Sequence, residues 1–203
     1  RAGARPVGQD SGLFDIRVLA ERILDGEVPD PDVTPGDLDE RAVLADYASF
    51  LRGLVDLSGI RPLRVVVDAG NGMGGFTVPA VLEAGAGLPA LPLTIVPLYF
   101  ELDGTFPNHE ANPLLEENRE DITAEVIRQK ADIGIAWDGD ADRCFFIDGS
   151  GEFIAGDFIT ALLAEAALMK QPGSTIIYDV RASYAVKDTV ARYNGRALMN
   201  RVG

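Results

Sequence analysis

Cysteine, basic residues and long hydrophobic runs are all scarce in this sequence, and each scarcity argues against a class of protein. The single cysteine, Cys144, rules out an internal disulfide framework and a zinc site built on cysteines, and it fits a reducing compartment. Eighteen Lys and Arg against 32 Asp and Glu give a net charge of −14. Nucleic acids and anionic membranes attract basic surfaces, so this charge balance disfavours both as partners.

The longest apolar stretch, residues 90–100, is too short to span a bilayer and is interrupted by Pro92 and Pro97. No signal peptide opens the chain, which begins at Arg1 rather than at Met. A composition of 47% hydrophobic and 25% charged residues excludes wholesale disorder. At roughly 150 residues per domain, the chain holds one large domain, or one domain and a piece of another. We therefore expect a fragment of a longer cytoplasmic protein.

Residues 1–36 are expected to be an appendage with a linker. Apolar side chains recur at helical spacing over residues 13–24, which predicts one helix. The prolines between Pro29 and Gly36 disfavour regular structure, because proline lacks a backbone donor and restricts the residue before it.

From Leu38 onward, helical and strand patterns alternate. Apolar periodicity predicts helices at residues 38–56, 75–83, 121–130, 157–170 and 182–193. Apolar runs predict strands at residues 63–67, 91–98, 132–137, 144–148, 152–154 and 175–179, the fourth and fifth forming a hairpin. This alternation implies an α/β fold in which a mixed, largely parallel sheet is layered with helices. We place a boundary near residue 154, so that residues 155–203 form an incomplete second α/β domain of the same kind.

Three aspartates directly follow the strand predicted at 132–137: Asp138, Asp140 and Asp142. Carboxylates so close together repel one another unless a cation neutralises them, and hard oxygen ligands suit Mg²⁺ or Ca²⁺. Loops at the carboxyl ends of parallel strands are where α/β sheets place their sites. The neighbouring Arg143 suits a phosphate held against the metal, because a guanidinium binds phosphate oxygens in pairs.

The aspartate segment is also compatible, in part, with other interpretations. An EF-hand loop needs glycine at its sixth position and glutamate at its twelfth, where this sequence has Arg143 and Gly149, so that motif fails. A DxD-type nucleotide-sugar transferase needs only Asp138 and Asp140. A non-catalytic acidic module that binds a cation or a partner also remains open, as does an acidic turn with its carboxylates in water.

A glycine-rich segment follows the first predicted strand and matches the spacing of a dinucleotide-binding fingerprint at Gly70, Gly72 and Gly75. That fingerprint expects an acidic residue about 20 positions later, and residues 88–95 contain none. We favour a tight turn that packs a helix onto the strand, with Asp68 and Asn71 as turn and cap groups.

A polar loop, residues 102–113, contains the only histidine, His109. A lone histidine in a loop more often forms hydrogen bonds than takes part in chemistry, and the sequence leaves its role open.

Taken in order, three segments resemble the second domain of the α-D-phosphohexomutases: Val65-Val66-Val67-Asp68-Ala69-Gly70-Asn71-Gly72, Asp103-Gly104-Thr105-Phe106-Pro107-Asn108-His109 and Asp138-Gly139-Asp140-Ala141-Asp142-Arg143. The Phe-Pro-Asn-His run is similar to the phosphomannomutase/phosphoglucomutase branch. The resemblance covers nearly the whole chain. It implies that residues 1–36 are the tail of domain 1, residues 37–154 domain 2 and residues 155–203 the first part of domain 3.

This resemblance implies a Mg²⁺-dependent isomerase that interconverts hexose 6-phosphate and hexose 1-phosphate, of mannose or of glucose, through a phosphoserine and a hexose 1,6-bisphosphate. Asp138, Asp140 and Asp142 match the Mg²⁺ ligands of the family, and Arg143 matches the arginine beside the phosphoserine. Arg181 matches a basic residue near the bound sugar phosphate, whereas Tyr184 stands where the family often has a second basic residue.

The catalytic serine belongs to a Ser-His-Asn-Pro segment of domain 1, and nothing in this chain resembles it. We therefore expect the 203-residue chain alone to bind Mg²⁺ weakly and not to turn over. The preference between mannose and glucose and the oligomeric state are left open.

Overall fold

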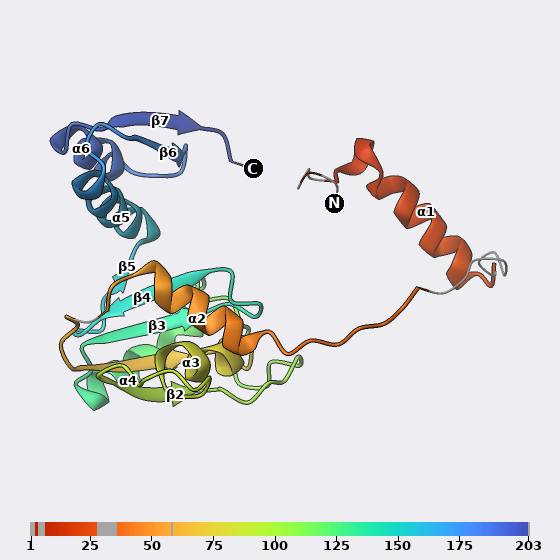
Figure 1. Ribbon diagram of the computed structural model, residues 1–203, viewed down its shortest axis with the longest axis horizontal. Helices are drawn as coiled ribbons and strands as arrows, with labels where there is room; N and C mark the ends of the chain where they lie inside the picture. The colour runs from red at the N-terminus through yellow and green to blue at the C-terminus, as the bar shows by residue number, and fades with distance from the viewer. Residues whose placement is uncertain (1–2, 4–6, 28–35, 58, 203) are drawn as a thin grey trace. The chain divides into compact units, whose positions relative to one another are not determined.

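The computed structural model describes residues 3, 7–27, 36–57 and 59–202. The chain divides into two compact units, Arg1–Arg41 and Ala42–Gly203. In the first unit, the 3-10 turn η2 (Gln9–Ser11) leads into helix α1 (Leu13–Leu24), whose bounds are those predicted (Figure 1). Nearly all of the predicted linker lies outside the described residues.

The second unit contains a five-stranded sheet in the order β2-β1-β3-β4-β5. Its strands are β1 (Leu63–Asp68), β2 (Leu93–Leu98), β3 (Ile133–Trp137), β4 (Cys144–Asp148) and β5 (Phe153–Ile154). The first three strands run parallel to one another, and β4 and β5 are antiparallel to their neighbours. The predicted α/β fold with a mixed, largely parallel sheet is confirmed, and so is the hairpin.

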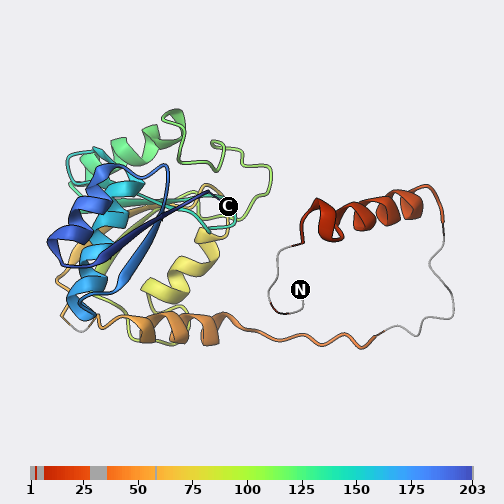
Figure 2. The ribbon, with the colours of Figure 1, turned by 90° about the horizontal axis from the view of Figure 1, so that it is seen from above.

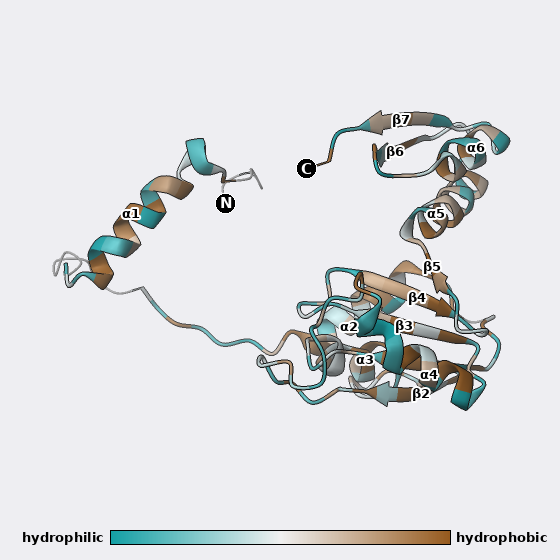
Figure 3. Ribbon diagram, turned by 180° about the vertical axis from the view of Figure 1, so that it is seen from behind, coloured by the Kyte–Doolittle hydropathy of each residue, from teal (hydrophilic) through white to brown (hydrophobic). Residues whose placement is uncertain are grey.

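Helices cover both faces of this sheet, which gives three layers (Figures 1 and 2). Successive side chains of a strand point to opposite faces, so Val66 lies on one face of β1 while Val65 and Val67 lie on the other. Helix α4 (Glu120–Gln129) packs Ile122 and Val126 against the Val66 face. Helix α3 (Gly74–Leu82) covers the opposite face, and α2 (Leu44–Leu54) lies against α3. Figure 3 shows the hydrophobic character of β4 between these layers.

Helix α2 begins later than predicted, at Leu44 rather than at residue 38. Residues 38–43 are all exposed, so no packed apolar face supports a helix there. A short isolated helical segment is marginal in water without such packing.

The remainder of the second unit is a two-stranded parallel sheet of β6 (Thr175–Asp179) and β7 (Arg196–Asn200), with helices α5 (Gly156–Lys170) and α6 (Tyr184–Arg192). Its core consists of small and branched residues from the two helices: Ala161, Ala164, Leu168, Val186 and Val190. Strand β7 was not predicted from the sequence. Every residue of this strand is exposed, so it shows no burial pattern from which a strand is recognised.

Among the described residues, the structure contains no helix that combines the length and the apolar character needed to cross a membrane.

Candidate functional site

Three loops meet at one edge of the five-stranded sheet. Asp68, the last residue of β1, pairs with Leu98 of β2 on one side and with Ala136 of β3 on the other. Because these strands are parallel, the segments that follow them emerge side by side: residues 69–73, 99–113 and 138–143. The three segments singled out in the sequence are therefore brought together.

The glycine-rich loop forms a tight turn, as predicted. Asp68 Oδ1 accepts a hydrogen bond from Gly70 N at 2.8 Å, which confirms its role as a turn group. A Cβ at Gly72 would lie 2.4 Å from the Gly139 carbonyl oxygen, so only glycine permits this approach of the first loop to the third. The amide of Met73 donates to the same carbonyl at 2.9 Å. Gly72 thus allows the backbone of the first loop to pack against the backbone of the third.

The aspartate loop connects β3 to β4 and presents three carboxylates to a common point. One oxygen from each of Asp138, Asp140 and Asp142 lies within 4.8 Å of the others, a spacing suited to a single cation. Asp138 is buried, whereas Asp140 and Asp142 are exposed. The loop turns through Ala141, whose φ of 59° is left-handed. The arrangement is therefore a half-buried, acidic, oxygen-only ligand set.

Arg143 closes the loop and contacts the carboxylates. Its amide donates to Asp138 Oδ1 at 3.0 Å, and its Nε lies 2.5 Å from Asp138 Oδ2 and 3.5 Å from Asp142 Oδ1. The buried Oδ2 has this ion pair and no further partner among the described residues. Three carboxylates face one arginine here, and the excess of negative charge fits a divalent cation.

A buried ion pair joins the second loop to the end of β1. His109 Nε2 lies 3.0 Å from Asp68 Oδ2, and the two side chains are only 11% and 2% exposed. His109 Nδ1 lies 2.8 Å from the Glu110 carbonyl oxygen. The hydrogen bond with Asp68 is the main reason that the pKa of His109 rises to about 9, with burial acting against it.

Tyr99 packs edge-on against the His109 ring, with the ring centroids 5.3 Å apart. Its hydroxyl donates to Asp121 Oδ2 at 2.6 Å, and this bond is the first cause of a Tyr99 pKa of about 12. The Asp68–His109 pair was not predicted from the sequence. The available signal was a polar residue at the end of one parallel strand and a histidine in the loop after its neighbour.

The Asp68–His109 pair predicts a specific pH dependence of stability. The folded-state pKa of His109 is raised from 6.5 to about 9, so its contribution is complete below pH 6.5 and is lost as pH rises through 9. We expect about 2 kcal/mol of unfolding free energy to disappear between pH 7 and pH 9. Urea denaturation at both pH values measures this, and His109→Gln should lack this loss. An equal loss in the variant would contradict the assignment.

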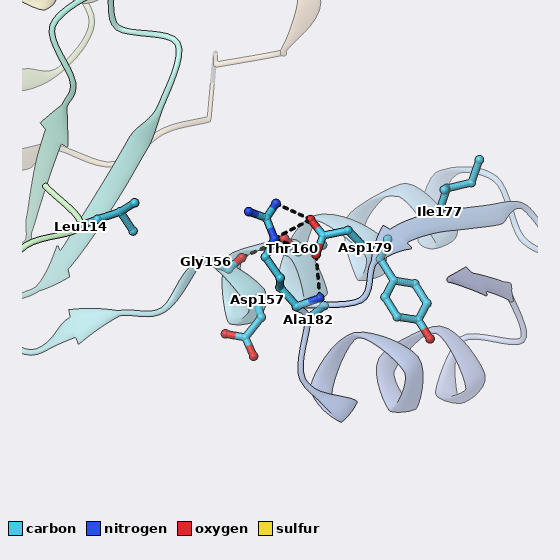
Figure 4. Close-up of a pocket in the computed structure, with 9 residues that line it drawn as sticks. Leu114, Gly156, Asp157, Thr160, Ile177, Asp179 and Ala182 are labelled. Carbon is cyan, nitrogen blue, oxygen red and sulfur yellow. Dashed lines mark hydrogen bonds and ion pairs between the residues drawn. The ribbon is translucent and has the colours of Figure 1, made fainter. Parts of the chain in front are cut away.

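Arg181 lies in the loop after β6, away from the aspartate loop in the sequence, and its ion pair is with Asp179. Its Nη2 lies 2.6 Å from Asp179 Oδ2, and its amide donates to Asp179 Oδ1 at 2.8 Å (Figure 4, where Asp179 is labelled). This bonding lowers the pKa of Asp179. The pair borders an open cavity of about 580 Å³ lined in part by Asp157, Thr160 and Ala182. Tyr184, which follows this loop, is 78% exposed.

The fold and the carboxylate loop define an α/β domain with a candidate cation site, and comparison with known proteins identifies its class. The family model described as phosphoglucomutase/phosphomannomutase, alpha/beta/alpha domain II, matches residues 45–151. The chain belongs to the phosphoglucomutase/phosphomannomutase family.

Named relatives align with this chain over its whole length. A phosphomannomutase of Escherichia coli is 43% identical, with 100% of this chain and 44% of the relative covered. A Xanthomonas campestris protein named "Phosphohexose mutases" is 40% identical over 100% of this chain and 43% of its own length. The chain thus spans less than half of the length of these curated relatives. A DxD-type transferase is not favoured by these comparisons.

A solved structure of similar fold is a phosphoglucomutase/phosphomannomutase family protein from Burkholderia thailandensis. It is 33% identical, with a TM-score of 0.78 over 94% of this chain and 39% of that one. A Thermus thermophilus structure titled putative phosphomannomutase has a TM-score of 0.71 at 20% identity, over 83% of this chain and 38% of that one, and supports the fold alone.

Proposed function

We propose that this chain is the metal-binding part of a Mg²⁺-dependent phosphohexomutase, with residues 1–36 as the tail of domain 1, residues 37–154 as domain 2 and residues 155–203 as the first part of domain 3. The reaction is the reversible conversion of hexose 6-phosphate to hexose 1-phosphate through a phosphoserine and a bisphosphorylated sugar. The observation that carries the proposal is the convergence of three carboxylates, one of them buried and paired with Arg143, at the carboxyl edge of the sheet.

Asp138, Asp140 and Asp142 would hold the Mg²⁺. When bound there, a divalent cation withdraws charge from the oxygens of a transferring phosphoryl group. The buried Asp138 fixes the position of the site, because its Oδ1 is already bonded to the Arg143 amide. The two exposed aspartates leave one side of the site open to a phosphate.

Arg143 is assigned to the phosphoryl group itself. Its side chain is 54% exposed while its guanidinium contacts two of the aspartates, so it can present donors to phosphate oxygens beside the metal. Phosphoryl transfer depends mostly on positioning and on electrostatic stabilisation, and this pairing of a cation site with a guanidinium supplies both.

Arg181 is assigned to the phosphate of the sugar. Its side chain is 72% exposed, and its pairing with Asp179 holds it beside the cavity at the carboxyl end of β6. Tyr184 offers a hydroxyl rather than a charge in this region. We infer a mannose or glucose phosphate as substrate and the cytoplasm as location, the latter from the single cysteine.

A segment exchange tests this function. The chain replaces the corresponding 44% of the E. coli phosphomannomutase, and conversion of mannose 1-phosphate and glucose 1-phosphate to the 6-phosphates is assayed with and without Mg²⁺. We expect Mg²⁺-dependent activity that falls at least about 100-fold with Asp140→Asn. A folded hybrid whose activity is unchanged by the Asp140→Asn substitution would contradict the proposal.

A further inference from the structure

His109 uses both of its ring nitrogens. Nδ1 faces the Glu110 carbonyl oxygen, which can only accept, so this nitrogen carries a proton. Nε2 faces a carboxylate oxygen of Asp68, whose other oxygen accepts from Gly70 N. An ionised Asp68 and a doubly protonated imidazole satisfy every one of these contacts. The pair therefore joins the polar loop to the end of β1 through a buried charge-assisted hydrogen bond.

The polar loop, which His109 bonds to the end of β1, lies beside the aspartate loop. Phe106 and Ala111, on either side of His109 in the sequence, border the space beside Gly139, which stands between two of the aspartates. Their Cζ and Cβ atoms lie 3.1 Å and 3.7 Å from the place where a Cβ of Gly139 would stand. The Gly139 carbonyl oxygen also accepts a hydrogen bond from the Met73 amide. The peptide that sets the spacing of Asp138 and Asp140 is thus bordered by the polar loop and bonded to the glycine-rich loop.

The polar loop contains a strained residue that its surroundings must hold in place. Phe106 has a φ of 51°, a left-handed conformation that costs a non-glycine residue free energy and persists only when its surroundings enforce it. Asn108 supplies one further tie, from its Nδ2 to Asn71 Oδ1 at 2.8 Å. The Asp103 amide also donates to the Asn71 carbonyl oxygen at 3.0 Å. Of these bonds, the one from His109 to Asp68 is charged.

We propose that His109 is a positioning residue for the metal site, holding Phe106 and Ala111 against Gly139 through its bond to Asp68. This inference rests on the proposed function, because it assumes that Asp138, Asp140 and Asp142 bind Mg²⁺. The hydrogen bonds of His109 are to Asp68 and to the Glu110 carbonyl oxygen, so it acts on the metal site through the loop.

The groups around the His109 ring determine how its bond to Asp68 responds to pH. Asp68 from β1 and the charge of Asp121 from α4 both favour the imidazolium, and Asp121 also accepts the Tyr99 hydroxyl. Loss of the Nε2 proton would turn a lone pair toward the Asp68 carboxylate and break the tie. Mg²⁺ affinity should then fall at alkaline pH. Simple charge repulsion between the imidazolium and the metal predicts the opposite, a rise.

The test is a Mg²⁺ titration of the 203-residue chain at pH 7.5 and pH 9.5. It is followed by the fluorescence of Trp137, the single tryptophan, which lines a groove with Asp140 and Ala141. His109→Gln should bind about 10-fold more weakly than the wild type at pH 7.5, the usual scale for residues that orient metal ligands. The matched control, Thr105→Ala, removes a hydrogen bond to Asp103 within the same loop and should bind as the wild type does.

The wild-type affinity should fall from pH 7.5 to pH 9.5, while that of His109→Gln stays flat. Circular dichroism verifies that the variants fold. If a variant does not fold, the pH dependence of the wild-type Mg²⁺ affinity still tests the inference. Equal affinity of His109→Gln and wild type, or a wild-type affinity that is flat or rises with pH, would overturn the inference. Asp140→Asn run in parallel separates the two proposals: if it binds as the wild type does, the metal site itself is wrong.

Discussion

Asp140→Asn is expected to lower the Mg²⁺ affinity of this chain by at least about 100-fold, because it removes a charged oxygen ligand from a set of only three. The fold should be little changed, since Asp140 is exposed and lies in a loop. Isothermal titration with Mg²⁺ at neutral pH measures the affinity, and thermal unfolding without metal measures the stability.

Asp188→Asn is the matched control, since it removes the same charge from an exposed position on α6. It should leave Mg²⁺ affinity within about twofold of the wild type, because exposed charges at a distance are screened by salt. Equal losses in the two variants would mean that net charge, and not a ligand set, attracts the cation.

Gly72→Ala is expected to destabilise the second unit by about 3 kcal/mol, at the upper end of the cost of overpacking. The new Cβ would stand 2.4 Å from the Gly139 carbonyl oxygen, and a backbone neighbour cannot move aside as a flexible side chain can. The displaced Gly139 would also carry the aspartate loop with it, so Mg²⁺ affinity should fall together with stability. Urea denaturation with and without Mg²⁺ measures both effects.

Gly104→Ala provides the comparison for that experiment, since a Cβ at Gly104 meets nothing within 4 Å. Its unfolding free energy should stay within about 0.5 kcal/mol of the wild type. If Gly72→Ala is tolerated as well as Gly104→Ala, the close approach of the first and third loops is not as described.

Much of this site follows from the sequence, because its parts obey local rules. A buried apolar run such as Val65-Val66-Val67 predicts a central strand, and parallel strands bring the segments after them to one edge. The spacing of Asp138, Asp140 and Asp142 is itself local. Arg143, next in the sequence, was expected beside them and is found there.

The features that the sequence did not reveal depend on contacts between distant residues. Asp68 and His109 are 41 positions apart, and neither residue alone indicates the other. The strand β7 pairs with β6 through its backbone while its side chains remain exposed, so its composition carries little information. The late beginning of α2 at Leu44 likewise reflects which residues find a packing partner.

The position of a bound metal tests the proposed ligand set most directly. Mn²⁺ accepts the same carboxylate ligands as Mg²⁺ and scatters anomalously, so crystals of this chain soaked in Mn²⁺ would locate the site. We expect one strong anomalous peak in contact with oxygens of Asp138, Asp140 and Asp142, and its loss in Asp140→Asn. A peak elsewhere, or well-ordered aspartates pointing apart with no peak between them, would contradict it.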